Sequence, residues 1–191
     1  MKVPKILIAF LVLAGFLLWW ILSIDKHDDW LHCNIKLTLE RFEEDSKARN
    51  IYSHTLKLDS LTEFDWDSLI YFSNPIDSDD GTFSNAEISK EIGIKITGRT
   101  ICDYCDRLIF IKNGEVVSFV DLDSKDNKDP RIRIKGGEES GATVNSNIFL
   151  KKDATFIVYE SCKKGNYGGF VFLPVNKLEQ FKTDLENSCY K

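Results

Sequence analysis

The pattern of apolar and polar residues divides the chain into an apolar N-terminal run and a longer alternating part. Residues Ile6 to Ile24 contain no charge, and a helix needs about 20 consecutive apolar residues to cross the core of a bilayer. Trp19 and Trp20 lie near the end of this run, where aromatic rings favour the interface between membrane and water. The pattern therefore predicts a transmembrane helix at residues 6–24.

The charges on either side of this run predict its orientation. Lys2 and Lys5 precede it, and the net acidic residues 25–29 follow it. Because basic residues are retained on the cytoplasmic side, we expect residues 1–5 to lie inside and the rest of the chain outside. A cleaved signal peptide is the main alternative, but its apolar core usually spans about 7–15 residues and ends at small residues. No Ala-x-Ala site follows the run, so an uncleaved single-pass anchor is favoured over cleavage and over a buried helix.

The remaining pattern predicts a neck at residues 25–33 and one globular domain at residues 34–191. Alternating or short apolar runs with turn residues between them indicate strands. These runs lie at residues 54–58, 69–72, 108–111, 115–120, 155–159 and 169–173. Strands that follow one another with few helices between them predict an α+β domain with a mainly antiparallel sheet and two or three helices. Residues 34–52 carry both a helical and a strand-like pattern.

Local cap and turn signals place further elements. Ser84 and Glu87 have the spacing of a capping box, and Gly93 is placed to end the helix that they begin. Asn113-Gly114 lies between two apolar runs, which favours a tight hairpin because both turn residues need a positive φ.

The C-terminal third of the chain is less regular. Residues 123–147 are polar and predict a long excursion without regular structure. A closing helix is predicted from a cap at Asn176, and its apolar face is formed by Leu178, Phe181 and Leu185.

Composition narrows the classes of partner. The chain of 191 residues has a formal net charge of −5, and its first 24 residues contain basic but no acidic side chains. The exported part is therefore more acidic still, which argues against nucleic acid and against peripheral binding to anionic lipid. The composition is compatible with a protein partner. The absence of an Asn-x-Ser/Thr sequon favours a bacterial envelope, so we expect an inner (plasma) membrane protein with a periplasmic domain.

One stretch, residues 62–120, combines several of these signals in a distinctive order. Its parts are Phe64-Asp65-Trp66-Asp67, an apolar strand, the capped helix and Leu108-Ile109-Phe110-Ile111-Lys112-Asn113-Gly114-Glu115-Val116-Val117. This order resembles a set of small, uncharacterised bacterial envelope proteins and lipoproteins. The shared signals are strands, turns and a helix, so the resemblance implies an envelope location and no activity for individual residues.

The cysteines predict disulfide bonds. Outside the cytoplasm disulfides are the usual state of paired cysteines. Four of the five cysteines lie in the predicted domain, and the sequence does not choose among their pairings. The disulfide candidates are Cys102, Cys105, Cys162 and Cys189. Cys33, in the predicted neck, is the fifth cysteine and has no predicted partner.

Cys102 and Cys105 also have the spacing of a redox motif, so a thiol–disulfide oxidoreductase is the main alternative function. A reactive thiol needs a helix N-terminus or positive neighbours that lower its pKa. Here the acidic Asp103 and Asp106 flank the second cysteine, and a strand follows. Structural disulfides are therefore favoured over catalysis.

Metal binding is the second alternative. Zinc would require the four domain cysteines to converge, and His27, His32 and Cys33 form a candidate soft-metal cluster in the neck. Four aspartates resemble a calcium-binding loop, but they lack the alternating ligand positions and the glycine of such a loop. They are Asp121, Asp123, Asp126 and Asp129. We expect solvated residues in both places, and no cofactor.

No catalytic residues can be nominated from the sequence. Asp65 and Asp67 flank Trp66, but paired carboxylates need a cleft before acid and base roles can be assigned. The sequence therefore predicts a membrane-anchored, non-enzymatic binding or accessory module. An inhibitor or immunity-type role and an assembly role fit this prediction equally well.

Overall fold

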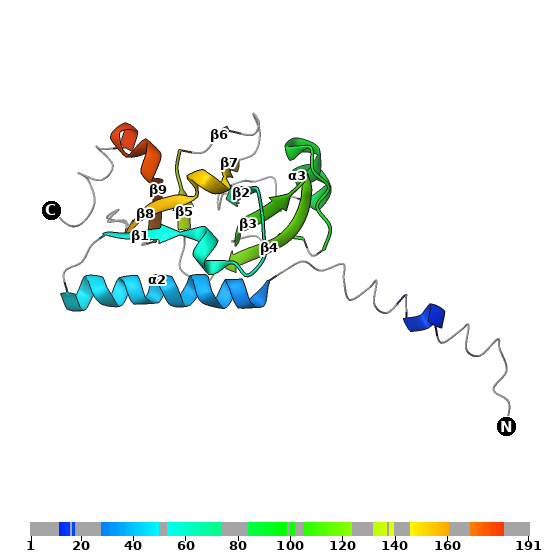
Figure 1. Ribbon diagram of the computed structural model, residues 1–191, viewed down its shortest axis with the longest axis horizontal. Helices are drawn as coiled ribbons and strands as arrows, with labels where there is room; N and C mark the ends of the chain where they lie inside the picture. The colour runs from blue at the N-terminus through cyan, green and yellow to red at the C-terminus, as the bar shows by residue number, and fades with distance from the viewer. Residues whose placement is uncertain are drawn as a thin grey trace, which may run out of the picture.

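The structure is a computed structural model in which two β-sheets share a core and one long helix, α2, lies along an edge of the molecule (Figure 1). It describes residues 12–15, 17, 28–49, 53–73, 84–98, 100–101, 105–123, 132–136, 138–139, 146–160 and 169–181. The helices are α2 (Asp29–Arg49), η1 (Leu58–Leu61), α3 (Asn85–Ile92), η3 (Lys151–Asp153) and η4 (Val175–Phe181). The strands are β1 (Ser53–Lys57), β2 (Ser68–Ser73), β3 (Cys105–Lys112), β4 (Glu115–Asp123), β5 (Ile132–Ile134), β6 (Glu138–Glu139), β7 (Ser146–Leu150), β8 (Thr155–Glu160) and β9 (Phe170–Pro174).

The strands form two sheets that are mainly antiparallel. One sheet has five strands in the order β4-β3-β2-β7-β6, and the other has four in the order β1-β8-β9-β5. Among the described strand pairs, β5 and β9 alone run parallel. The predicted α+β class and antiparallel pairing are confirmed, but the prediction of a single sheet is wrong. β2 pairs with β3 on one side and with the distant β7 on the other, and such long-range partners leave no local pattern in the sequence.

Helix α2 begins inside the stretch for which we predicted a neck. Asp28 Oδ1 accepts a hydrogen bond from Leu31 N at 2.9 Å, which caps the first turn. Leu31, Ile35 and Leu39 lie four residues apart on one face and are almost fully buried. The helix is therefore part of the domain core, and residues 34–49 are helical rather than extended.

Both local signals in the middle of the chain are confirmed. In α3, Ser84 Oγ accepts a hydrogen bond from Glu87 N, and the Glu87 carboxylate accepts one from Ser84 N. Gly93 ends the helix with a φ of 71°. At the turn between β3 and β4, Asn113 has a φ of 51° and Gly114 a φ of 78°, the left-handed values that the tight turn requires.

The C-terminal third differs more from expectation. β5, β6 and part of β7 lie within residues 123–147, so this stretch contributes to both sheets rather than forming an excursion. The predicted pair of strands after it is confirmed, since β8 and β9 are antiparallel neighbours. The closing helix is a 3₁₀ helix over the described residues, in which Leu178 and Phe181 pack against the last strands. Leu185 lies outside the described residues.

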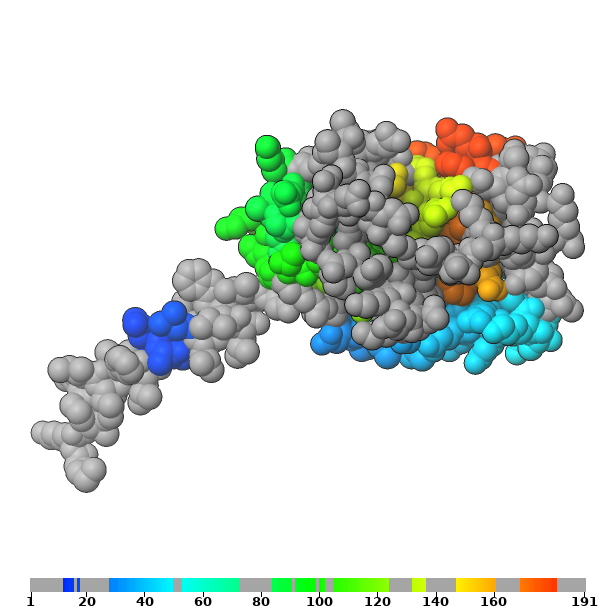
Figure 2. Space-filling view, turned by 180° about the vertical axis from the view of Figure 1, so that it is seen from behind, coloured from blue at the N-terminus to red at the C-terminus, as the bar shows by residue number. Residues whose placement is uncertain are grey.

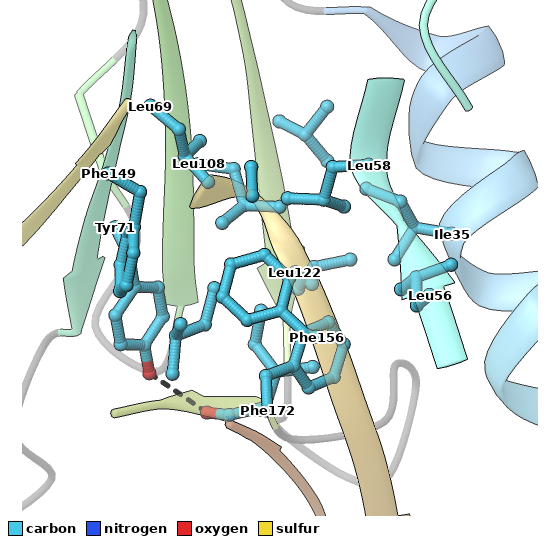
Figure 3. Close-up of a cluster of buried hydrophobic side chains, with 14 of the residues drawn as sticks. Ile35, Leu56, Leu58, Leu69, Tyr71, Leu108, Leu122, Phe149, Phe156 and Phe172 are labelled. Atoms are coloured by element: carbon cyan, nitrogen blue, oxygen red, sulfur yellow. Dashed lines mark hydrogen bonds between the residues drawn. The ribbon is translucent and has the colours of Figure 1, made fainter. Parts of the chain in front are cut away.

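Of the three apolar clusters among the described residues, the two larger ones join the sheets to α2 and α3. The larger one fills the space between the sheets and α2, and Figure 3 shows side chains from both sheets and from Ile35 of α2 meeting there. The smaller one lies between the five-stranded sheet and Ile88 of α3. Because both faces of this sheet are covered, the side chains in the middle of β3 are buried on either side.

Most of the predicted transmembrane segment lies outside the described residues. Residues 12–15 and 17 are helical, and Val12, Leu13 and Leu17 are exposed. Across the part of the chain that the structure describes, no helix combines the length and the apolar character needed to cross a bilayer.

Candidate functional site

The start of β3 places a cysteine and two charged side chains next to one another in the interior. Cys105, Asp106 and Arg107 are 1%, 5% and 0% exposed. Consecutive strand residues face opposite sides of a sheet. Accordingly, Cys105 and Arg107 face α3, whereas Asp106 faces the second sheet. Burial of a charge is costly unless the charge is paired, so the partners of these residues decide what the region can do.

On the α3 side, Arg107 forms a two-pronged ion pair with Asp121, the residue directly opposite it on β4. Arg107 Nε lies 2.5 Å from Asp121 Oδ1, and Nη2 lies 2.7 Å from Oδ2. The guanidinium also donates to Asn85 Oδ1 at 3.1 Å and lies over the ring of Phe119, 4.4 Å from its centroid. Asn85, which begins α3, also donates to Gly98 O at 2.9 Å. The hydrogen bond from Arg107 to Asn85 therefore ties α3 to the sheet.

On the other side, Asp106 takes part in a bridge between the two sheets. The Tyr71 hydroxyl of β2 lies 2.9 Å from Ile132 O of β5 and 3.2 Å from Asp106 Oδ1, and Figure 3 shows it reaching toward that strand. Ile132 N donates to Asp106 Oδ2 at 3.4 Å. We call Tyr71, Asn85, Asp106, Arg107 and Asp121 the buried polar end of the five-stranded sheet.

The opposite end of the same sheet carries charges that face solvent. Lys112 Nζ contacts Asp65 Oδ2, and Lys151 Nζ lies 2.8 Å from Asp59 Oδ1 and 3.0 Å from Asp65 Oδ1. Lys151 Nζ also lies 5.5 Å from the ring centroid of the buried Trp66. We call Asp59, Asp65, Lys112 and Lys151 the exposed charged end.

The carboxylates that flank Trp66 are engaged in this arrangement. Hydrogen bonds from Lys112 and Lys151 lower the pKa of Asp65 to about 2. Asp67 Oδ2 accepts a hydrogen bond from Asn113 N at 2.7 Å, which ties this loop to the hairpin turn. A carboxyl group with so low a pKa stays ionised near neutral pH and is poorly suited to act as a general acid.

The predicted disulfide residues fall mostly outside the described part of the chain. Cys105 is described, is buried against α3 and is disulfide-bonded, but its partner lies outside the described residues. The positions of Cys102, Cys162 and Cys189 are likewise not described. Cys33 is a free, exposed cysteine on α2. The pairing of the four domain cysteines therefore stays a prediction.

The candidate metal clusters receive no support from the described residues. His27, Asp126 and Asp129 lie outside them, and Asp121 is paired with Arg107. Within the described ranges, no group of three or more His, Cys, Asp or Glu side chains is arranged to hold a metal ion.

The comparisons with known proteins identify no relative. No family model matches the chain, and no match was found among curated proteins or among solved structures. The resemblance of residues 62–120 to envelope proteins therefore stays a prediction.

Sequence reasoning missed the residues that organise the buried polar end. Arg107 directly precedes the predicted strand at residues 108–111 and Asp121 directly follows the one at residues 115–120, and a charged residue that borders a buried strand is a signal that it is paired. It also missed Trp30 and Leu37, which α2 leaves 46% and 52% exposed. Their spacing of seven residues places both side chains on one face of a helix. That spacing marks them as a pair only once residues 29–49 are known to be helical.

Proposed function

We propose that this chain is a non-enzymatic binding or accessory module of the bacterial envelope, tethered to the inner membrane by residues 6–24. The observation that supports binding most directly is the outward face of α2. Trp30 and Leu37 both remain about half exposed there, at 46% and 52%. Large apolar side chains gathered on one exposed face favour contact with another protein, and tryptophan is enriched where such contacts are strongest.

The charged side chains of the buried polar end are engaged within the fold. Arg107 is held by Asp121 and Asn85, and Asp106 is engaged with Tyr71 and Ile132. Charged groups that are bonded to one another within the interior are not presented to a substrate. An inhibitor or immunity-type protein and an assembly accessory are both consistent with this proposal.

Site-specific photo-crosslinking of the full-length chain in intact cells tests the proposal. The crosslinking residue is placed at Leu37, and at the exposed Glu115 of the hairpin as the matched control. We expect protein adducts from position 37 and few from position 115, all in membranes that retain the chain after carbonate washing. Equal labelling at both positions would contradict a binding role for α2. A soluble species that begins near Asp25 would contradict the tether.

A further inference from the structure

The outward face of α2 carries an apolar stripe with the spacing of a helix-pairing seam. Trp30, Cys33 and Leu37 are separated by three and then four residues and are all exposed, which is the a-d-a spacing of a heptad. The opposite face of α2 is buried against the domain. Figure 1 and Figure 2, which view the molecule from opposite sides, both place α2 along the same edge of the molecule.

We propose that two copies of this chain pair in parallel through the stripe formed by Trp30, Cys33 and Leu37. This inference rests on the proposed function, because it takes the tether as given. The tether at residues 6–24 enters the same membrane in both copies and ends shortly before α2 begins at Asp29. The two α2 helices therefore start at the same height and point in the same direction.

A second copy supplies a matching partner for every residue of the stripe. In a parallel pair around a two-fold axis, each seam residue meets its own counterpart. Trp30 then meets Trp30, and Leu37 meets Leu37, so every apolar side chain in the stripe has an apolar partner. Helix pairing of this kind requires an apolar face with heptad spacing on each helix. The first turns of α2 provide that face in both copies.

The charges beyond the stripe limit the contact to the membrane-proximal turns. The next seam positions are Glu40 and Glu44, both exposed. In a parallel pair these carboxylates would face their counterparts, and like charges repel. The contact is therefore short and confined to the first turns of α2, whereas stable interfaces bury roughly 1,200–2,000 Å². Confinement to one membrane raises the effective concentration and makes so short a contact sufficient.

Cys33 makes the pairing measurable without a foreign label. The full-length chain in membranes is treated with a copper–phenanthroline oxidant and examined on a non-reducing gel. We expect a disulfide-linked dimer from the wild type and none from Cys33→Ser. In the Cys33→Ser background, Leu37→Cys should restore the dimer. The exposed positions Ala48→Cys and Glu115→Cys serve as matched controls and should give about tenfold less.

A second variant separates pairing from random collision. Replacing both exposed residues, Trp30→Glu with Leu37→Glu, should lower the Cys33 dimer yield about tenfold while leaving the circular dichroism spectrum unchanged. Equal dimer yields from all cysteine positions would overturn the pairing. Protection of Cys33 from a water-soluble maleimide without any dimer would mean that lipid covers the face, and would also overturn it.

The outcomes keep the two proposals apart. Recovery of the chain in the soluble fraction would contradict the tether, whatever the crosslinking pattern. Crosslinks from Leu37 to a different protein, without a dimer through Cys33, would support the binding module and overturn the pairing.

Discussion

The two ends of the five-stranded sheet hold similar ion pairs in opposite environments. At the buried polar end, the side chains of Arg107 and Asp121 are 0% and 8% exposed. At the exposed charged end, those of Lys112 and Asp65 are 31% and 66% exposed. Water solvates the second pair whether or not its members meet, whereas the first pair has been withdrawn from water. Burial, rather than the presence of an ion pair, therefore decides how much each end depends on its charges.

The largest expected effect comes from breaking the buried pair. Asp121→Asn should lower the free energy of unfolding by about 3–5 kcal/mol, because it leaves the Arg107 charge without its counter-ion in the interior. Denaturant unfolding of both proteins measures the change. The double variant Arg107→Met with Asp121→Leu is the control and should lose less than Asp121→Asn, since no buried charge remains. A double variant less stable than Asp121→Asn would contradict this account.

The next effect comes from Cys105, which begins β3, together with Cys102. Replacing Cys102 and Cys105 with serine should lower the free energy of unfolding by about 2–5 kcal/mol, because a native disulfide restricts the unfolded chain. Cys105 begins a strand and is only 1% exposed, so insulin reduction by the wild type should be negligible. Robust reductase activity, lost in a variant that unfolds like the wild type, would instead favour the oxidoreductase alternative.

At the exposed end, the hairpin turn should matter more than the charges. Gly114→Val should destabilise the domain by about 1 kcal/mol or more, because a β-branched residue resists the φ of 78° found there. Thermal unfolding measures the loss. Glu115→Val at the exposed start of β4 is the control, and a Gly114→Val protein that unfolds at the wild-type temperature would contradict the assigned turn.

The smallest effect is expected from the exposed ion pair, and it should depend on pH. The folded-state pKa of Asp65 is lowered from 3.8 to about 2, so its contribution is present above the unfolded pKa and is lost as the pH falls toward 2. Asp65→Asn should therefore differ slightly from the wild type at neutral pH and converge with it between pH 4 and pH 2. Unfolding free energies measured across that range test this. A difference that stays constant with pH would show that the carboxylate charge is not involved.

Local residue patterns by themselves determined the elements that depend on near neighbours. The capping box at Ser84 and Glu87 and the Asn113-Gly114 turn were predictable because each is made by residues a few positions apart. The strands at the centre of the sheet were predictable from their apolar runs. The same patterns could not divide the strands into two sheets, nor find β5 within a polar stretch, because those depend on partners distant in the chain.

The buried polar end was decided by the tertiary structure alone. Counting outward from the hairpin turn, where Lys112 pairs with Glu115, would place Arg107 opposite Val120. A bulge at Val117 shifts the register, and Arg107 instead lies opposite Asp121. A one-residue slip exchanges the two faces of a strand, so the bulge is what brings the carboxylate to the guanidinium. The sequence supplied both charges, and only the packed sheet determined that they meet.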